Sequence, residues 1–433
     1  MKTDTPPSPF HPMPLDALRR SGPLGFLASM LAAAGTLAAA GCLQQSSGPT
    51  EWSSKPRSAT SSSSPSNSSA VADRNADRAT GTVAPSAPSG STAASGGAAR
   101  GPGAVAPPPA LRPPPPIPVA PLAPGGSPRP AALSLLQAAS ESPSALLRCN
   151  AVEAVAPDAD ASRSVIQRGL VDSNRAVRFV SAMAVGTHRL CDLSLLVEPL
   201  LRDESESVRA AAIFALSQCG RRVDPTPLAS MILSDDPEVR GNAALVLGEM
   251  GNPTALPLLD GCLGRGMALA NPARVRIVEL QVAEAQVRLG DARAADPVRA
   301  ALFAPPEQAE LVALACQICG RIKDERSVAS LRGLVEANGN DARPPEVRLA
   351  AIAALAQLGA LSTDVLPMVE FLAASDRPEV RAQAAVTLGR LGDPRGLATA
   401  ARLMADHDPF VQVAAAGAVT ALTGPGRATG VSG

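Results

Sequence analysis

The chain has 433 residues and no net charge, with 39 basic and 39 acidic residues, but the charge is unevenly distributed. Residues 1–130 contain ten Lys or Arg against five Asp or Glu, which leaves 29 basic and 34 acidic residues downstream. Nucleic-acid binding depends mainly on basic surface that displaces counterions, and single strands also need aromatic stacking platforms. The mildly acidic downstream region has no Tyr or Trp, so we expect no nucleic acid among the partners.

Residues 1–41 have the features of an export signal. Arg19 and Arg20 precede the uncharged apolar stretch GPLGFLASMLAAAGTLAAAG, which ends at Cys42. A basic region, an apolar region and small residues at its end are together typical of secretory signals. The ending AAAGC resembles the lipobox of bacterial lipoproteins, although Ala39 replaces the usual Leu. This resemblance implies that Cys42 receives a diacylglycerol on its sulfur and becomes the mature N-terminus.

The signal predicts a lipid-anchored protein of the cell envelope, at the periplasmic face of a bacterial membrane. Two alternatives remain open for the same stretch. Cleavage after Ala40 would give a soluble periplasmic protein. An uncleaved segment would be a membrane anchor, although its Ala and Gly content makes it weakly apolar for a span.

Residues 42–130 are rich in Ser, Pro, Ala and Gly and contain few large apolar residues. Such a segment cannot bury enough surface to offset its ordering entropy, so we predict a disordered tether. The part PPPALRPPPPIPVAPLAP favours extended polyproline II. We interpret it as a spacer that holds the folded part away from a membrane, with a PxxP peptide ligand as the alternative. Residues 425–433 are expected to form a flexible tail.

One pattern recurs in the remaining part of the chain. The pattern is Val-Arg, small residues at the fourth and fifth positions after the Val, Leu or Val at the eighth, and Gly at the ninth and twelfth, and individual copies depart from it at one or more positions. Close copies start at Val177, Val208, Val239, Val347 and Val380, and weaker copies start at Leu147, Val278, Leu311 and Val411. The copies are 30 to 39 residues apart and each is followed by a second apolar stretch. Each unit is therefore predicted to be a helix, a turn, a second helix and a short loop.

The copy SDDPEVRGNAALVLGEMG, residues 234–251, shows how the positions serve a helix. Asp236 is a good N-cap and Pro237 suits the first helical position. Gly248 and Gly251 are expected to let the chain turn at the helix end. One helix pair cannot bury its own apolar face, whereas a stack of pairs buries a continuous core. The repeats therefore predict an all-α solenoid.

These repeats resemble HEAT repeats of the short type found in phycobilisome-lyase-like proteins, and LGDPRGLATAARLM, residues 391–404, is especially similar to that family. The resemblance implies a right-handed α-solenoid of eight or nine helical hairpins over residues 131–424. It implies little about function, because such repeats serve many unrelated proteins.

In that family an Asp in each loop between repeats and the Arg after the Val form a hydrogen-bonded ladder along the stack. The resemblance assigns this ladder to Asp172, Asp203, Asp235, Asp376, Arg178, Arg209, Arg240, Arg348 and Arg381. The Arg position is occupied by Glu279, Val312 and Gln412 in three copies. We expect irregular curvature around residues 264–312 and a terminal cap at Gln412.

Cys316 and Cys319 form a C-x-x-C motif, which in an exported protein could serve redox chemistry or a metal. Both align with core positions of the repeat, and no second ligand pair for zinc is present, so we interpret them as buried apolar residues. The sequence leaves open the disulfide state of the other Cys residues of the solenoid: Cys149, Cys191, Cys219 and Cys262. A disulfide between adjacent repeats, for instance Cys191 with Cys219, is compatible with an oxidising compartment.

The sequence offers no catalytic constellation. His188 and His407 are the only His residues in the repeats, and neither belongs to a His-Glu pair of the kind used by di-iron hydroxylases built on similar repeats. No Ser-His-Asp elbow, phosphate-cradling Gly loop or H-x-x-x-H motif is present. We therefore expect no catalytic residue, no metal and no cofactor.

The predicted function is a membrane-tethered scaffold that binds a protein partner as a monomer. The binding surface is expected on the inner side of the curve, lined by the second helix of each unit. The candidate residues on those helices are Glu198, Arg202, Arg332 and Arg402. The alternatives are an enzyme of bilin-lyase type and a purely structural envelope protein. An enzyme needs a closed pocket with convergent polar groups, whereas a scaffold shows an open groove.

Overall fold

The computed structural model describes residues 114–118, 126–267, 270–339 and 342–424, all within one compact unit. The predicted export signal, Cys42, most of the tether and the tail lie outside these residues. Within them the chain is all helical, with eighteen α-helices and no strand, so the predicted fold class is confirmed. None of these helices is long and apolar enough to cross a membrane.

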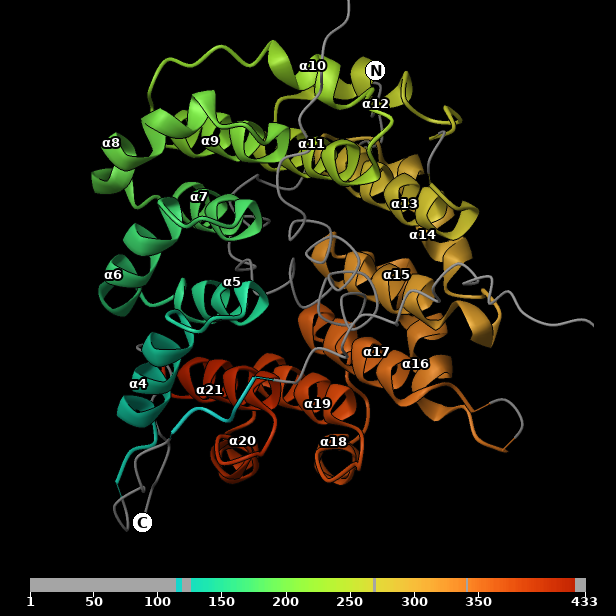
Figure 1. Cartoon of the computed structure of the whole chain (residues 1–433). Coiled ribbons are helices and arrows are strands. Elements are labelled where there is room, and N and C mark those ends of the chain that lie inside the picture. The colour runs from blue at the N-terminus through green and yellow to red at the C-terminus, as the bar shows by residue number, and fades with distance from the viewer. Residues whose placement is uncertain (1–113, 119–125, 268–269, 340–341, 425–433) are drawn as a thin grey trace, which may run out of the picture. The chain divides into compact units, whose positions relative to one another are not determined.

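The helices form an inner and an outer layer (Figure 1). The inner helices are α5 (Ala145–Val155), α7 (Arg175–His188), α9 (Glu206–Gln218), α11 (Pro237–Met250), α13 (Pro272–Arg288), α15 (Ala309–Arg321), α17 (Pro345–Leu358), α19 (Pro378–Leu391) and α21 (Pro409–Leu422). The outer helices are α4 (Arg129–Ala139), α6 (Ala159–Leu170), α8 (Ser194–Val197), α10 (Pro227–Met231), α12 (Leu256–Asp260), α14 (Ala295–Ala301), α16 (Val328–Glu336), α18 (Leu366–Leu372) and α20 (Leu397–Leu403). Each inner helix contains one of the nine predicted repeat copies.

The inner helices are those with the Val-Arg motif, which corrects the expectation that the second helices line the inner side. Each inner helix packs against the next one, whereas neighbouring outer helices barely touch. In a curved stack the elements on the concave side converge and those on the convex side spread apart. The concave layer therefore consists of the first helix of each predicted unit.

The predicted caps explain where the inner helices begin and end. The Asp236 carboxylate accepts hydrogen bonds from the amides of Glu238 and Val239, at 2.8 and 3.4 Å, which satisfies orphan donors at the start of α11. Gly251 ends the same helix with φ of +67°, a conformation that costs a residue without a Cβ little.

Gly248, in contrast, does not serve a turn. It lies inside α11, and a Cβ at this position would come within 3.0 Å of the Ala285 Cα on α13. The same close approach recurs between Gly186 and Ala215, between Gly320 and Ala354, and between Gly389 and Ala418. At these four junctions the ninth-position Gly allows the close contact between adjacent inner helices.

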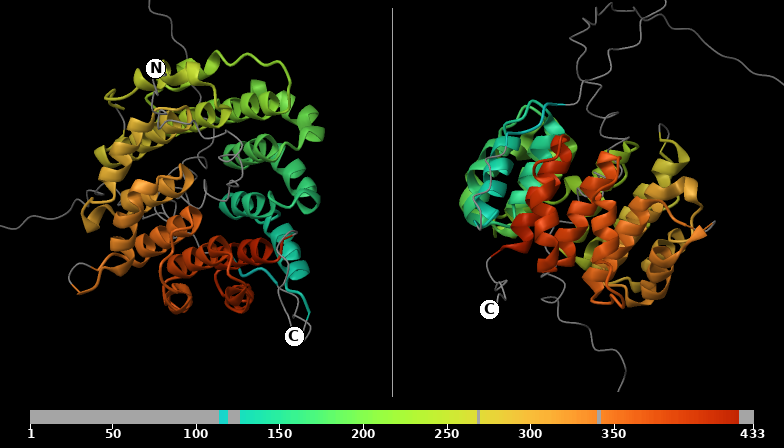
Figure 2. Two further views of the ribbon diagram at one scale, coloured as in Figure 1. Left: turned by 180° about the vertical axis from the view of Figure 1, so that it is seen from behind. Right: turned by 90° about the horizontal axis from the view of Figure 1, so that it is seen from below.

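The stack closes on itself (Figure 2), which the sequence did not predict. The last helix, α21, packs against both α4 and α5, so α4 lies between α21 and α5 as α20 lies between α19 and α21. Arg129 on α4 donates to the Thr420 carbonyl at 3.0 Å. A Cβ on Gly417 would lie 3.1 Å from the Ala154 Cβ of α5. The N-terminal helix therefore supplies the outer partner that α21 lacks.

A short proline-rich segment also binds the closing helix. Residues 114–118, which we call the strap, are extended, and the Ile117 amide donates to the Gln412 side-chain oxygen at 2.7 Å. The Gln412 amide nitrogen donates back to the Ile117 carbonyl at 3.1 Å. The expected terminal cap at Gln412 is therefore wrong, because this residue binds an N-terminal segment. The first helix also begins at Arg129, inside the range assigned to the tether.

The close packing of the inner helices generates a test. Replacing Gly186 with Ala would place a Cβ 2.5 Å from the buried ring of Phe214 and 3.0 Å from the Ala215 Cα. Overpacking of this kind costs about 1–3 kcal/mol. We expect Gly186→Ala to lower the free energy of unfolding by that amount in urea denaturation.

The matched control is Gly333→Ala on α16, where nothing lies within 4 Å of the added Cβ. Ala is favoured over Gly inside a helix by about 0.5–1 kcal/mol, so this variant should be neutral or more stable. Equal effects of the two substitutions would show that the inner contact does not depend on glycine.

Candidate functional site

The inner layer carries a chain of four charges across three consecutive helices. Glu284 on α13 accepts hydrogen bonds from the Arg321 Nε and Nη2 on α15 at 2.7 and 2.6 Å. The same carboxylate accepts from Arg288 at 3.1 Å, and Arg288 pairs with Glu249 on α11 at 3.0 Å. The charges therefore alternate from α11 to α15.

Glu284 is the buried centre of this network, with 5% of its surface exposed. Burial alone would raise its pKa, but the positive charges of Arg321 and Arg288 and their hydrogen bonds outweigh this and lower the pKa to about 2. The Arg288 pKa is raised because Glu249 and Glu284 outweigh the effect of its own burial. Glu284 is thus held ionised at neutral pH.

A pocket lies beside the closure, between α5, α19 and α21. The space inside it is small, about 60 Å³, and it is open to solvent on one side. Its polar residues are Asn150, Glu153 and Arg390, and the other walls are Ala, Gly and Val. The pocket is partly open, and so it is neither the closed pocket expected of an enzyme nor the open groove expected of a scaffold.

Arg390 connects this pocket to the charge network. Burial lowers the pKa of Arg390, and the positive charge of Arg321 lowers it further. The negative charge of Glu153 partly opposes both effects, and the resulting pKa is about 10. Helix α17 separates α15 from α19 in the stack. The charges of Arg321 and Arg390 therefore interact although α17 stands between their helices in the stack.

The Arg–Asp ladder exists but is less regular than predicted. Arg178 pairs with Asp203 through two hydrogen bonds of 2.7 and 2.9 Å, and its Nη1 donates to the Asp172 carbonyl at 2.9 Å. Arg381 pairs in the same way with Asp406, which the sequence interpretation had missed. Arg148, also missed, pairs with the Asp172 carboxylate. Each of these Arg side chains thus links the loop before its own helix to the loop before the next inner helix.

The assignment of Asp235 and Asp376 to the ladder is corrected by the structure. The ladder Asp stands two residues before the helix N-cap, a position occupied by Ser234 and Ser375 in these loops. Asp235 is therefore one residue out of register, 73% exposed and 3.8 Å from the Arg240 guanidinium. Asp376 contributes only its carbonyl, which accepts from Arg381. The Asp-x-(Asn/Ser/Asp) spacing would have identified the correct residues.

Three of the predicted ladder arginines do not pair with a carboxylate in the loop before the next inner helix. Arg209 donates to the Asp203 carbonyl at 2.8 Å and pairs with Glu206 of its own helix. Arg240 donates to the Ser234 and Arg265 carbonyls. Arg348 donates to the Val335 carbonyl. These side chains still tie a loop to a helix, but through backbone oxygens.

The copies without the Arg differ locally. Helix α13, which contains Glu279, has 17 residues against 14 in α11, and one turn before Glu279 the Arg276 guanidinium donates to the Gln308 side chain. Val312 is buried. The contact between α13 and α15 is the smallest between adjacent inner helices. The expected irregularity therefore coincides with a thin contact.

The four candidate binding residues lie on the outer layer. Glu198 and Arg202 belong to the 3-10 turn after α8, where Glu198 pairs with Arg221. Arg332 on α16 donates to the Ala360 carbonyl at 2.9 Å. Arg402 on α20 is exposed. They do not converge on the concave surface, because the second helices face outward.

The inner charges could have been found from the repeats. Glu249, Arg288, Arg321 and Arg390 all stand at the tenth position after the motif's first residue, which the predicted pattern did not include. A charge recurring at one position of a repeat lies on one face of the stack.

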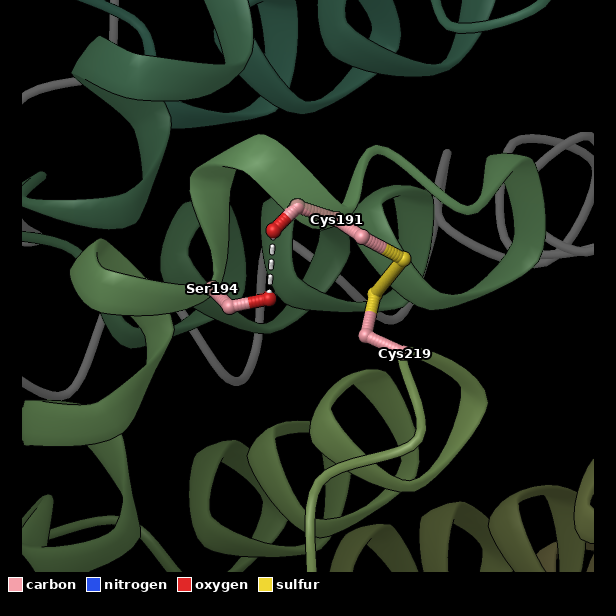
Figure 3. Close-up of a disulfide and its surroundings, with 3 residues drawn as sticks. All are labelled: Cys191, Ser194 and Cys219. Carbon is pink, nitrogen blue, oxygen red and sulfur yellow. Dashed lines mark hydrogen bonds between the residues drawn. A yellow bond between two sulfur atoms is a disulfide. The ribbon is translucent and has the colours of Figure 1, made fainter.

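Cys191 and Cys219 form a disulfide, with Cα atoms 5.3 Å apart (Figure 3). The sequence left the state of these two residues open, and the structure shows the disulfide between adjacent repeats. The bond joins the turn after α7 to the end of α9, and the Ser194 hydroxyl donates to the Cys191 carbonyl at 2.6 Å. Closing a loop of this length contributes roughly 3–4 kcal/mol in the chain-entropy model.

The remaining thiols of the described residues are buried. Cys316 and Cys319 are fully buried, as expected for core residues, and burial raises the pKa of Cys319 to about 11. Burial likewise raises the pKa of Cys262. His188 is partly buried, which lowers its pKa to about 4, and His407 is exposed in a loop. In the described residues no group of three potential ligands could hold a metal ion.

The charge network predicts a specific pH dependence. The Glu284 pKa lies below that of an unfolded Glu, so its contribution to stability is complete above about pH 4.5 and is lost as the pH falls toward 2. We expect Glu284→Gln to lower the free energy of unfolding at pH 7 by about 3–5 kcal/mol, because it leaves buried arginines uncompensated. Denaturant titrations from pH 7 to pH 3 should show a shallower acid loss than in the unmodified protein.

The exposed Glu336 provides the control, since Glu336→Gln should change the stability by less than about 0.5 kcal/mol at every pH. An unchanged stability of Glu284→Gln would contradict the role of the network.

Comparison with known proteins agrees with the fold. A family model of HEAT repeats matches residues 132–217, 193–267 and 365–429. Comparison with curated protein sequences gave no match.

Three solved structures illustrate the similarity. Human deoxyhypusine hydroxylase in complex with glycerol is 18% identical over 62% of this chain and 96% of its own, with a TM-score of 0.31. The CpcE–CpcF complex of phycocyanin lyase from Nostoc is 19% identical over 59% and 85%, with a TM-score of 0.27. A variant of Kap121p is 14% identical over 68% and 41%, with a TM-score of 0.27. At such values the matches carry no argument about function. The family match and the nine inner helices together show that the described part of the chain folds as an α-solenoid of HEAT-type hairpins.

Proposed function

We propose that the protein is a non-enzymatic scaffold that binds a protein partner through the concave surface of its solenoid. The observation that carries the proposal is the set of charged residues on the inner helices, where Arg288 and Arg321 pair with the buried Glu284, and Glu153 and Arg390 line the pocket beside the closure. Closure fixes the inner helices relative to one another before any partner arrives. A preorganised surface binds with less entropy loss than one that must be assembled.

The chemistry of the surface favours recognition over catalysis. The network carboxylate Glu284 is held ionised by two arginines, and the buried thiols have pKa values raised by desolvation. A general base needs a pKa near the working pH, and a thiol nucleophile needs a lowered one. Fixed charges of alternating sign instead give complementarity to a charged partner.

We further propose that the scaffold works outside the cytoplasm, attached to a bacterial membrane through Cys42. The Cys191–Cys219 disulfide supports an oxidising compartment, because Cys191 is exposed and a reducing cytosol would keep an accessible pair as thiols. The lipid attachment rests on the lipobox-like sequence AAAGC.

Attachment is tested by Cys42→Ser. We expect the unmodified chain to incorporate labelled palmitate and to sediment with membranes, because several acyl chains give stable anchoring. The Cys42→Ser variant should lose both properties. Cys149→Ser, in the solenoid, is the control and should retain them. If the unmodified chain and the Cys42→Ser variant both sedimented with membranes and neither incorporated labelled palmitate, an uncleaved membrane anchor would be favoured.

Binding through the concave surface is tested with two matched Arg→Gln substitutions. Affinity capture from envelope extracts, quantified by mass spectrometry, should lose its specific partner with Arg390→Gln on α19. Arg402→Gln, on outer helix α20, should retain it. The opposite pattern would assign binding to the outer layer, and capture at background level by all three baits would overturn the scaffold function.

A further inference from the structure

The strap binds a polar site on α21, which we call the Gln412 site. Gln412 is only 3% exposed. Its Oε1 accepts from the Ile117 amide at 2.7 Å, and its Nε2 donates to the Ile117 carbonyl at 3.1 Å. The same Nε2 donates to the Met404 carbonyl, just after α20, at 3.2 Å. The bond to Met404 holds the side-chain amide in position, so that it pairs with both backbone groups of one strap residue.

The Gln412 site stands where other repeats have a rung of the Arg–Asp ladder. Arg178 and Arg381 occupy the same repeat position, and each pairs with an Asp carboxylate in the loop before the next inner helix. An Arg in place of Gln412 could only donate hydrogen bonds, so the Ile117 amide would lack an acceptor. Gln offers an acceptor as well as donors. The change from Arg to Gln therefore makes this position bind peptide backbone in place of a carboxylate.

The bound strap shows which chemistry the Gln412 site accepts. Residues 114–118 are Pro-Pro-Pro-Ile-Pro, and because Pro has no backbone N–H, Ile117 carries the only one in the strap. The Ile117 side chain is half-buried and packs against the core of the solenoid, whereas Pro116 and Pro118 are exposed. Flanking prolines preorganise an extended chain, which lowers the entropy lost on binding. The site therefore fits an extended segment with one branched apolar residue between prolines.

Few contacts hold the strap in the Gln412 site. In the described part of the chain its hydrogen bonds to the solenoid are the two with Gln412. Pro115, Pro116 and Pro118 are exposed. Because the strap belongs to the same chain, its effective concentration at the site is of about millimolar order. A segment of another protein can thus replace the strap, but it has to compete with it.

We propose that the Gln412 site binds an extended segment of a partner protein, in which one branched apolar residue stands between prolines, and that the strap is its intramolecular competitor. The strap covers the site until the partner segment displaces it. This inference goes beyond the proposed scaffold function, because Gln412 belongs neither to the charge network nor to the pocket at the closure.

The test uses the full chain and a fluorescein-labelled, C-terminally amidated Pro-Pro-Pro-Ile-Pro peptide. Ile117→Pro vacates the site, since it removes the amide donor and the branched side chain of the strap and preserves an extended backbone. We expect saturable binding to the Ile117→Pro variant by fluorescence anisotropy. The unmodified chain should bind the peptide at least about fivefold more weakly, because its own strap competes.

Further substitutions in the Ile117→Pro background locate the binding. Gln412→Leu should weaken peptide binding at least tenfold, because it removes both pairing atoms. Gln412→Arg introduces the residue of the other ladder positions and should have the same effect, and melting curves show whether each variant is folded. The matched control is Gln383→Leu, which removes another buried amide, on α19, and should leave affinity within twofold. A peptide of five prolines should not bind, since it has no N–H to donate to Gln412.

Four results would overturn the proposal: no peptide binding by Ile117→Pro, equal affinity of the unmodified chain, unchanged affinity in both Gln412 variants, or equal binding of the five-proline peptide. If the strap served only stability, Ile117→Pro would lower the melting temperature and bind no peptide. A dimer in analytical ultracentrifugation that Ile117→Pro abolishes would assign the site to the strap of a second copy instead. None of these results involves Arg390, so failure here leaves the capture test of the scaffold function unaffected.

Discussion

The close approach of adjacent inner helices is the constraint on which the rest of the structure depends. In four inner helices Gly at the ninth position meets an Ala backbone of the next helix, as in Gly248 with Ala285 and Gly320 with Ala354. The outer helices have no equivalent contact and spread apart. This difference between the layers curves the stack, and nine units bring α21 back to α5. At the closure Gly417 meets Ala154, so the joint uses the same kind of contact as the units do.

Curvature of this kind also determines what the concave surface can contain. Small residues occupy the helix contacts, and longer side chains at the tenth position extend from them. Glu249 pairs there with Arg288, and Arg321 pairs with Glu284, which stands at the sixth position of its copy. Because these groups are partly desolvated, their interactions are stronger than those of exposed pairs on the outer layer. The pocket at the closure lies where three inner helices from the two ends of the solenoid meet.

The sequence predicted those features that local chemistry decides. The Asp236 cap, the Gly251 helix end, the nine copies and the buried Cys316 and Cys319 all follow from residue type and spacing. Features that depend on the distance between repeat units could not be predicted from the sequence. The Cys191–Cys219 bond requires a Cα separation that spacing does not give. Closure depends on small rotations summed over all units. The ladder carboxylates Asp235 and Asp376 were misplaced by one residue because Asp also occurs beside the position that serves the ladder.

Closure has a consequence for how this chain can change in length. An open solenoid gains or loses a unit at modest cost, because each unit contacts only its two neighbours. Here α4 completes the hairpin of α21, and Arg129 and Ile117 bind that helix from the N-terminal side. A tenth unit would move α21 away from α4 and α5 and expose the apolar faces of all three. The number of repeats is therefore fixed by geometry, and variation is confined to loops and to the lengths of individual helices, as in the longer α13.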